Sequence, residues 1–237
     1  MQAEPLTIVL FGVKGSGKDT IGDYLQTEHS FVKESFAWPI KQMAKLAFPA
    51  FTDEDLFGSS ENRERFYEQY RLSNCPWCGS GLVYDKYGSD GQLLTADEPM
   101  RLRCEANPDH TDLAECITPR FVLKTLGTQW GRSLCSDIWV NGCLERIVQK
   151  RKEQPNLQFV VTDGRFTNEL IGSKRSGAHC VKLTRGLVAS TDAHQSEAEF
   201  RVIPDVAFDV VLDNANFTLD ELPQHVDKML ETSFNAK

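Results

Sequence analysis

The chain has 237 residues, of which 41% are hydrophobic and 25% are charged, and this length and balance suit one soluble α/β domain with an insertion. The 26 Lys and Arg against 34 Asp and Glu give a net charge of −8, which argues against a protein that binds polynucleotides through a basic face. No apolar run is long enough to cross a bilayer, and the N-terminal residues lack an export signal, so we expect a cytoplasmic protein whose seven Cys form no disulfide framework.

A glycine-rich turn follows the first predicted strand. Residues 6–11 (LTIVLF) are an apolar run typical of a buried strand in a parallel sheet, and the sequence GVKGSGKDT comes directly after it. The glycines let the backbone point several N–H groups at one anion, and an amphipathic helix from Lys18 adds its positive end. Because the Lys18 side chain can reach the β- and γ-phosphates of a nucleotide, this turn predicts a phosphate-binding loop.

The two residues after Lys18 distinguish this loop from the commonest one. The spacing G-x-x-x-x-G-K is usually followed by Ser or Thr, whereas here Asp19 comes first and Thr20 second. This order is similar to the turn of nucleoside monophosphate kinases, in which the threonine would bind an α-phosphate oxygen. The Asp19 carboxylate can bind Mg²⁺ directly or through a water, because this ion prefers oxygen ligands.

Strands and helices alternate along most of the chain. Further strands are predicted over residues 31–36, 158–163, 178–185 and 206–214. Helices are predicted from Pro39, over 53–72, from Thr118 with Pro119 at the first helical position, over 136–152, around 168–176 and near the C-terminus. This alternation predicts a doubly wound parallel sheet flanked by helices, with ligands bound beyond the carboxyl ends of the strands.

A carboxylate and two arginines stand where predicted strands end. Asp163 ends the strand VVTD, and Arg165 follows two residues later. Phosphoryl transfer needs cations to offset negative charge and an acid to orient Mg²⁺ or the attacking group, so both are candidate catalytic residues; the alternative is a turn with a local ion pair. Arg185 begins a polar stretch, residues 185–199, for which we expect either a lid over ATP or a solvated loop.

Residues 73–117 have a different texture, with Cys pairs, Gly and Asp turns and little periodicity, and we interpret them as an inserted module that resembles a zinc ribbon. The segment NCPWCGSG has the C-x-x-C spacing of a zinc knuckle, and LRCEANPDH supplies a further Cys and His. Four such ligands predict a structural zinc site, which has no open coordination position for catalysis. The expected ligands are Cys75, Cys78, Cys104 and His110, with Cys116 as the alternative to His110.

Six motifs resemble, in this order, those of the deoxynucleoside monophosphate kinases of tailed bacteriophages. They are GVKGSGKDT, WPIK, NRE, PRFVLKTLGT followed by IW, VVTDGRFTNE and HQSEAE. The resemblance covers most of the chain outside 73–117 and implies a P-loop kinase core over residues 1–72 and 118–237. The family moves the γ-phosphate of ATP to a deoxynucleoside 5′-monophosphate with Mg²⁺, and the resemblance also implies a homodimer. The zinc module is not an expected part of that family.

The resemblance assigns donor-side roles residue by residue. Asp163 and Arg165 would lie between donor and acceptor, and Arg185 would lie on the adenine or lid side. The loop residues that would hold ATP and its metal are Lys14, Gly15, Ser16, Gly17, Lys18, Asp19 and Thr20.

Four residues would serve the acceptor if the resemblance holds. Lys41 in WPIK, Arg63 in NRE and Arg120 in PRFVLK would bind the monophosphate or brace the transferred group. Trp139 would pack against the base of the substrate. The alternatives are that Lys41 and Arg63 are surface charges and that Trp139 is a core residue of an amphipathic helix.

Two other functions fit parts of the sequence. The GKD turn also resembles that of animal-type phosphomevalonate kinases, so another small-molecule P-loop kinase is an alternative. A zinc-containing NTPase that binds nucleic acid or a protein partner is a second alternative, although the acidic charge balance argues against nucleic acid.

Overall fold

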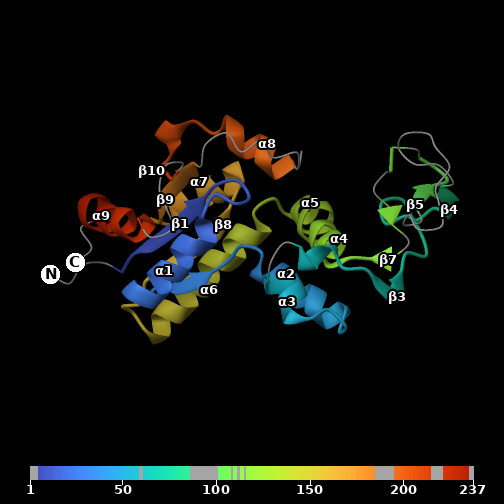
Figure 1. The fold of residues 1–237 in the computed structure, drawn as a ribbon, viewed down its shortest axis with the longest axis horizontal. Coiled ribbons are helices and arrows are strands. Elements are labelled where there is room, and N and C mark those ends of the chain that lie inside the picture. The colour runs from blue at the N-terminus through green and yellow to red at the C-terminus, as the bar shows by residue number, and fades with distance from the viewer. Residues whose placement is uncertain are drawn as a thin grey trace. The chain divides into compact units, whose positions relative to one another are not determined.

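The chain folds into two compact units (Figure 1). The structure is a computed structural model and describes residues 5–58, 61–85, 101–107, 109–110, 113–114, 116–184, 195–214 and 221–234. The first unit comprises Met1–Pro39 and Trp130–Lys237, and the second comprises Ile40–Gln129. Residues 40–72 and 118–129, on either side of the predicted insertion 73–117, therefore belong to the same compact unit as the insertion. The resemblance to the phage kinases instead implies that they are part of the kinase core.

The first unit is built on a five-stranded parallel sheet, which confirms the predicted fold class. Its strands are β1 (Thr7–Phe11), β2 (Val32–Glu34), β8 (Phe159–Gly164), β9 (His179–Thr184) and β10 (Val210–Asp213). All neighbours are parallel, in the order β10-β9-β1-β8-β2, and β1 is buried along its whole length. Of these strands, Figure 1 labels β10, β9, β1 and β8. Because β1 lies between β8 and β9, the topology switches direction at its carboxyl end, where such sheets bind ligands.

Helices flank this sheet. Two of them, α1 (Lys18–His29) and α9 (Leu222–Phe234), bury apolar side chains against Ile8 and Leu10 of β1. Side chains alternate along a strand, so Val9 and Phe11 point to the other face. The helices α6 (Ile138–Glu153) and α7 (Thr167–Arg175) pack against each other, and α8 (Gln195–Val202) precedes the last strand. Among the described residues, none of the helices has both the length and the apolar character that crossing a membrane requires.

The short strand β2 forms one edge of the sheet and carries a buried charge. Glu34 is only 7% exposed. Its carboxylate accepts hydrogen bonds from Lys150 Nζ at 2.6 Å and from Arg146 Nη2 at 3.2 Å, and both cations belong to α6. These two ion pairs fix β2 to α6, in addition to its three-residue pairing with β8.

The second unit combines short helices with two small antiparallel sheets. Its helical segments are α2 (Trp38–Ala47), which begins in the first unit, α3 (Asp53–Phe57), the 3₁₀ helix Asn62–Glu64, α4 (Pro119–Lys124) and the π helix Thr125–Gly131, which ends in the first unit. One sheet pairs β3 (Tyr67–Arg71) with β7 (Cys116–Ile117), and the other contains β4 (Leu82–Asp85), β5 (Arg101–Cys104) and β6 (Leu113–Ala114). Thr118 Oγ1 accepts a hydrogen bond from the N–H of Phe121 at 3.1 Å, which confirms the predicted start of α4.

The segment 67–71 corrects one prediction, because it forms the strand β3 and is not part of a helix over 53–72. The rings of Tyr67 and Tyr70 lie with their centroids 4.9 and 5.7 Å from that of Phe51, in the loop before α3. The charge-rich composition suggested an exposed helix, whereas aromatic packing against the preceding loop favours an extended strand.

Several other predicted elements are shorter than expected, among them the strand predicted over 31–36, which covers only Val32–Glu34. The last strand covers only Val210–Asp213, since the 3₁₀ helix Asp205–Ala207 precedes it. The helix expected from residue 136 begins at Ile138. Of the predicted lid, 185–199, residues 185–194 and therefore Arg185 lie outside the described residues, and α8 begins at Gln195.

Candidate active site

The loop between β1 and α1 has the backbone geometry that the glycine spacing predicts. Gly15 and Gly17 have φ angles of +77° and +93°, in the left-handed region that favours glycine. A Cβ at Gly12 would lie 2.3 Å from Ser16 Oγ, so a larger residue there would displace the loop. Lys18 is the first residue of α1, so the positive end of that helix adjoins the curled backbone.

The Lys18 side chain braces this loop from within. It is 6% exposed, and its ammonium group donates hydrogen bonds to the carbonyls of Gly12 and Val13, each at 2.8 Å. It also donates to Ser16 Oγ at 3.3 Å. A cation is therefore held at the loop whose backbone could surround a phosphate, which agrees with the spacing G-x-x-x-x-G-K of the sequence.

The residues next to this lysine are open to solvent. Asp19 and Thr20, in the first turn of α1, are exposed, and so are Lys14 and Gly15 on the loop. An exposed carboxylate beside the phosphate loop fits a Mg²⁺ ion that keeps several of its waters.

Asn214 is a site residue that the sequence reasoning missed. It follows β10, is 7% exposed, and donates a hydrogen bond from Nδ2 to the carbonyl of Ser16 at 2.6 Å. Its own N–H binds the carbonyl of Thr184 at 2.8 Å, so β9 holds it in turn. A Cβ at Gly17 would lie 2.8 Å from Asn214 Nδ2, so a larger residue there would clash with Asn214 in addition to being strained by the positive φ. No local sequence pattern relates Asn214 to the loop. The two come together because the strand order places β10 beside β9 and β9 beside β1.

Asp163 has its oxygens occupied by one neighbouring turn. It accepts hydrogen bonds from Ser35 Oγ at 2.7 Å and from the N–H groups of Phe36 and Ala37, each at 2.9 Å. The carboxylate therefore caps the turn between β2 and α2. The sequence identified Asp163 but not these partners, because nothing local relates residues 35–37 to β8.

The turn that carries Arg165 is held by a buried carboxylate. Glu169 accepts hydrogen bonds from the N–H groups of Arg165 at 2.8 Å and Phe166 at 3.0 Å, and from Arg132 Nη2 at 2.6 Å. The Arg132 guanidinium lies 3.8 Å from the centroid of the Phe166 ring. Burial raises the pKa of Glu169 to about 7, although Arg132 and the two N–H groups act against this rise. Sequence reasoning missed Arg132. For the capping role of Glu169 a signal was available, because this residue stands four positions after Arg165, near the start of a helix.

The three basic residues expected to serve the acceptor share one neighbourhood in the second unit. Lys41 Nζ lies 5.0 Å from the centroid of the Phe57 ring. Arg63 Nη2 donates a hydrogen bond at 3.2 Å to the carbonyl of Gly58, the residue that follows Phe57. The residue after Arg63 is Glu64, which forms an ion pair with Arg120. Each of the three cations thus contacts the segment that runs from the end of α3 to the 3₁₀ helix, or belongs to it.

Trp139 belongs to the core of the first unit. It lies in the second position of α6 and is 4% exposed. This burial favours the core interpretation, so stacking on a substrate base stays a prediction for this residue.

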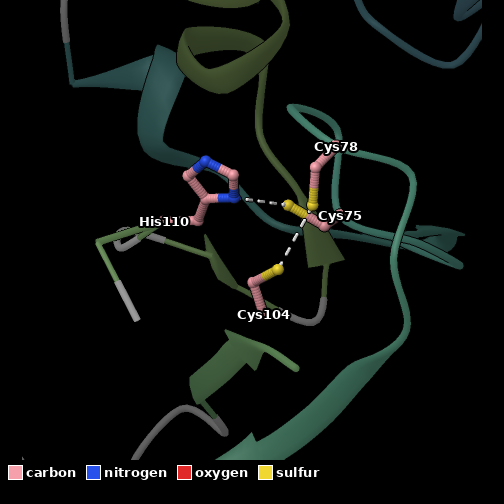
Figure 2. A group of neighbouring side chains, drawn as sticks. All are labelled: Cys75, Cys78, Cys104 and His110. Carbon is pink, nitrogen blue, oxygen red and sulfur yellow. Dashed lines mark hydrogen bonds between the residues drawn. The ribbon is translucent and has the colours of Figure 1, made fainter. Parts of the chain in front are cut away.

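The predicted zinc ligands converge in the second unit (Figure 2). One ligand atom each from Cys75, Cys78, Cys104 and His110 lies within 4.8 Å of all the others. Cys75 Sγ is 3.3 Å from His110 Nδ1, and Cys78 Sγ is 3.4 Å from Cys104 Sγ. The alternative ligand, Cys116, has a described backbone but its side chain lies outside the described part of the chain.

Comparison with known proteins gives relatives of one kind. No protein-family model matches the chain. It is 28% identical over 223 residues to a protein of Acanthamoeba polyphaga mimivirus provisionally named deoxynucleotide monophosphate kinase, with 90% of each chain covered. It is 25% identical to the deoxynucleotide monophosphate kinases of Escherichia phage RB69, over 249 residues, and Enterobacteria phage T4, over 241 residues; each match covers 94% of this chain and 98% of the relative.

Two solved structures are similar over nearly the whole chain at a low score. They are an unliganded sugar kinase from Janibacter sp. HTCC2649, covering 98% of this chain and 99% of that one, and dephospho-CoA kinase from Campylobacter jejuni, covering 97% and 98%. Each has 13% sequence identity and a TM-score of 0.41.

Proposed function

We propose that this protein transfers the γ-phosphate of ATP to a deoxynucleoside 5′-monophosphate. The observation that carries the proposal is the loop of Gly12 to Lys18, whose left-handed glycines and internal ammonium group form a phosphate cradle at the switch point of a parallel sheet. The viral and phage relatives, which match more than nine tenths of the chain in two cases and 90% in the third, support the acceptor class.

On the donor side, the loop residues Lys14 to Thr20 bind the phosphates of ATP. Lys18 offsets the charge that develops on the transferred group, and Thr20 binds an α-phosphate oxygen. Asp19 would hold Mg²⁺, which would supply positive charge to offset part of the negative charge of the phosphates. Arg185 acts at the adenine or lid side.

On the acceptor side, Lys41, Arg63 and Arg120 bind the phosphate of the monophosphate, and Trp139 contacts its base. An acceptor phosphate is already ionised at neutral pH, so transfer depends on in-line positioning and charge stabilisation more than on a general base. Arg165 adds a cation at the transferred group. Asp163 acts as a positioning residue through the turn 35–37, because three donors of that turn occupy its oxygens.

The remaining parts of the proposal concern the cellular location, the oligomeric state, the partners and the metal ions of the protein. We infer a cytoplasmic homodimer without a polynucleotide partner, with Mg²⁺ as the ion of the reaction and Zn²⁺ as a structural ion of the second unit. Light scattering measures the dimer, and single-stranded DNA added to the ATPase assay should leave the rate unchanged. DNA-stimulated hydrolysis would favour the NTPase alternative instead.

The decisive experiment is an ATP-consumption assay against dGMP, dTMP, dCMP, dAMP and their ribonucleotide counterparts. We expect turnover of at least one deoxynucleotide and no turnover of phosphomevalonate. If no monophosphate is phosphorylated, the proposed function is wrong.

A variant at the unusual loop residue sharpens this test. Asp19→Ala should lower Mg²⁺-dependent kcat on the order of a hundredfold, because phosphate charge is no longer offset at that position. Monophosphate affinity, measured by calorimetry, should not change. Equal losses of turnover and monophosphate binding, or no loss, would contradict the role of Asp19.

A further inference from the structure

The Cys/His group of the second unit matches the size of a tetrahedral zinc site (Figure 2). Ligands bound at about 2.3 Å for sulfur and 2.0–2.1 Å for nitrogen must lie roughly 3.5–3.8 Å apart. Two of the pairs, at 3.3 and 3.4 Å, and the 4.8 Å limit on all pairs bracket this range. The ligands come from three separate stretches of the chain, so their convergence is a property of the fold.

The local backbone also has the form of a zinc knuckle. Cys75 donates its N–H to the carbonyl of Ser80, and Gly79 donates its N–H to the carbonyl of Cys75, each at 2.8 Å. Gly79 has a φ of +75°, which lets the chain turn back immediately after Cys78. The Trp77 ring lies beside that of His110, with the ring centroids 5.3 Å apart and the planes tilted by 49°. His110 Nδ1 faces Cys75 Sγ (Figure 2).

The apolar core around these ligands is very small. Within the described residues of 72–117, the buried members of its hydrophobic cluster are Cys75, Leu102 and Cys104, and two of these three are ligands. A segment with so little apolar area does not hold its structure without a metal or a disulfide. The same residues would then supply both the core and the metal site.

This cluster is in contact with the helix that carries a proposed acceptor residue. Phe121 of α4 is partly buried and packs against the cluster that Cys75, Leu102 and Cys104 form. Its backbone N–H binds the capping Thr118, and its neighbour Arg120 forms the ion pair with Glu64. The start of α4 is thus held on one side by its cap and on the other by the metal-binding core.

We infer that Cys75, Cys78, Cys104 and His110 bind one Zn²⁺ ion that, through Phe121, fixes the start of α4 and so sets the affinity of Arg120 for the acceptor phosphate. The inference rests on the proposed function for its second half, and it assigns zinc a positioning role with no part in bond making. Loss of zinc loosens the contact of Phe121 and leaves the phosphate loop of the first unit intact.

The test compares two exposed cysteines. Elemental analysis of the wild type should find about one zinc ion per chain, and Cys135→Ser, the matched control outside the group, should retain it. Cys78→Ser should lose most of the zinc, raise the KM for the monophosphate about tenfold and leave the KM for ATP within about twofold. A wild type without zinc overturns the metal site, and equal changes of both KM values, or none, overturn the positioning role.

A second variant keeps the coupling testable if Cys78→Ser is unstable. Phe121→Leu should retain zinc and still raise the KM for the monophosphate severalfold, whereas an unchanged KM would overturn the link through Phe121. If the wild type phosphorylates no monophosphate, the proposed function fails, but hydrogen exchange at residues 119–124 still decides the inference. Faster exchange there after zinc removal supports it, and unchanged exchange overturns it.

Discussion

The phosphate loop and the Cys/His group are positioned by different means. The loop follows β1, whose five residues are all buried, and it is held further by Lys18 and by Asn214 from the far end of the sheet. The Cys/His group is surrounded by a cluster with only three buried members. A site on a large sheet can lose one functional side chain and keep its fold, whereas a site that is itself the local core cannot.

Lys18→Met should separate function from folding in the first unit. We expect kcat/KM to fall on the order of a thousandfold, because the cation at the transferred phosphate is lost. Circular dichroism should show the native helix and strand content, since the sheet core is unaffected. Lys152→Met, at an exposed position on α6, is the matched control and should retain full activity.

Zinc removal should, in contrast to Lys18→Met, disturb the fold of the second unit. With a strong chelator, we expect limited proteolysis within residues 61–129 to accelerate at least about tenfold, since metal binding and folding of such a module are linked. Fragments from cleavage in the first unit should appear at the rate seen without chelator. Acceleration in both units alike would show that the two are not held independently.

The buried carboxylate behind Arg165 should make stability depend on pH. The pKa of Glu169 is raised to about 7 in the folded protein, so folding favours its protonated form. The cost of burying the charge therefore grows as pH rises from about 4.5 towards 7, and the free energy of unfolding should fall on the order of 2 kcal/mol over this range.

Denaturant titrations at several pH values measure this slope. Glu169→Gln should remove most of it, and Glu153→Gln, at the exposed end of α6, should not. The same slope in wild type and Glu169→Gln would mean that the ion pair with Arg132 keeps Glu169 charged throughout.

The contact between Asn214 and the loop should contribute the smallest effect. Asn214→Ala removes the hydrogen bond to the Ser16 carbonyl, and losing a buried bond of this kind costs about 1–3 kcal/mol. We expect the KM for ATP to rise about tenfold with little change for the monophosphate. Val211→Thr, at an exposed position on β10, is the control; a normal KM for ATP in Asn214→Ala would show that Lys18 alone maintains the loop.

The features that sequence could predict are those whose causes lie within a few residues. Gly15, Gly17 and Lys18 belong to one turn, and the start of α4 depends on Thr118 and its neighbour Pro119. The alternation of strands and helices was sufficient for the parallel sheet. The convergence of Cys75, Cys78, Cys104 and His110 also agrees with the spacing, since Cys75 and Cys78 belong to one C-x-x-C motif.

The features that sequence reasoning missed depend on strand order or on distant packing. Asn214 reaches Ser16 only because β9 and β10 extend the sheet beyond β1. The turn that occupies Asp163 comes from β2, on the opposite side. The charged residues around Tyr67 favour a helix, and only the packing of its ring against Phe51 explains why the segment is a strand. No local pattern contains these relations, because each joins segments whose neighbourhood is decided by the whole fold.

The ion pairs of Glu34 have a consequence for association between molecules. An edge strand offers unpaired backbone groups to which another chain could add a strand, and proteins discourage this by keeping such strands short and placing charges on them. β2 has three residues, and its Glu34 is held inward by Arg146 and Lys150. Extending the sheet at this side would bring a foreign strand beside a buried charged cluster, so the same contacts that attach β2 to α6 also protect the protein against aggregation along this edge.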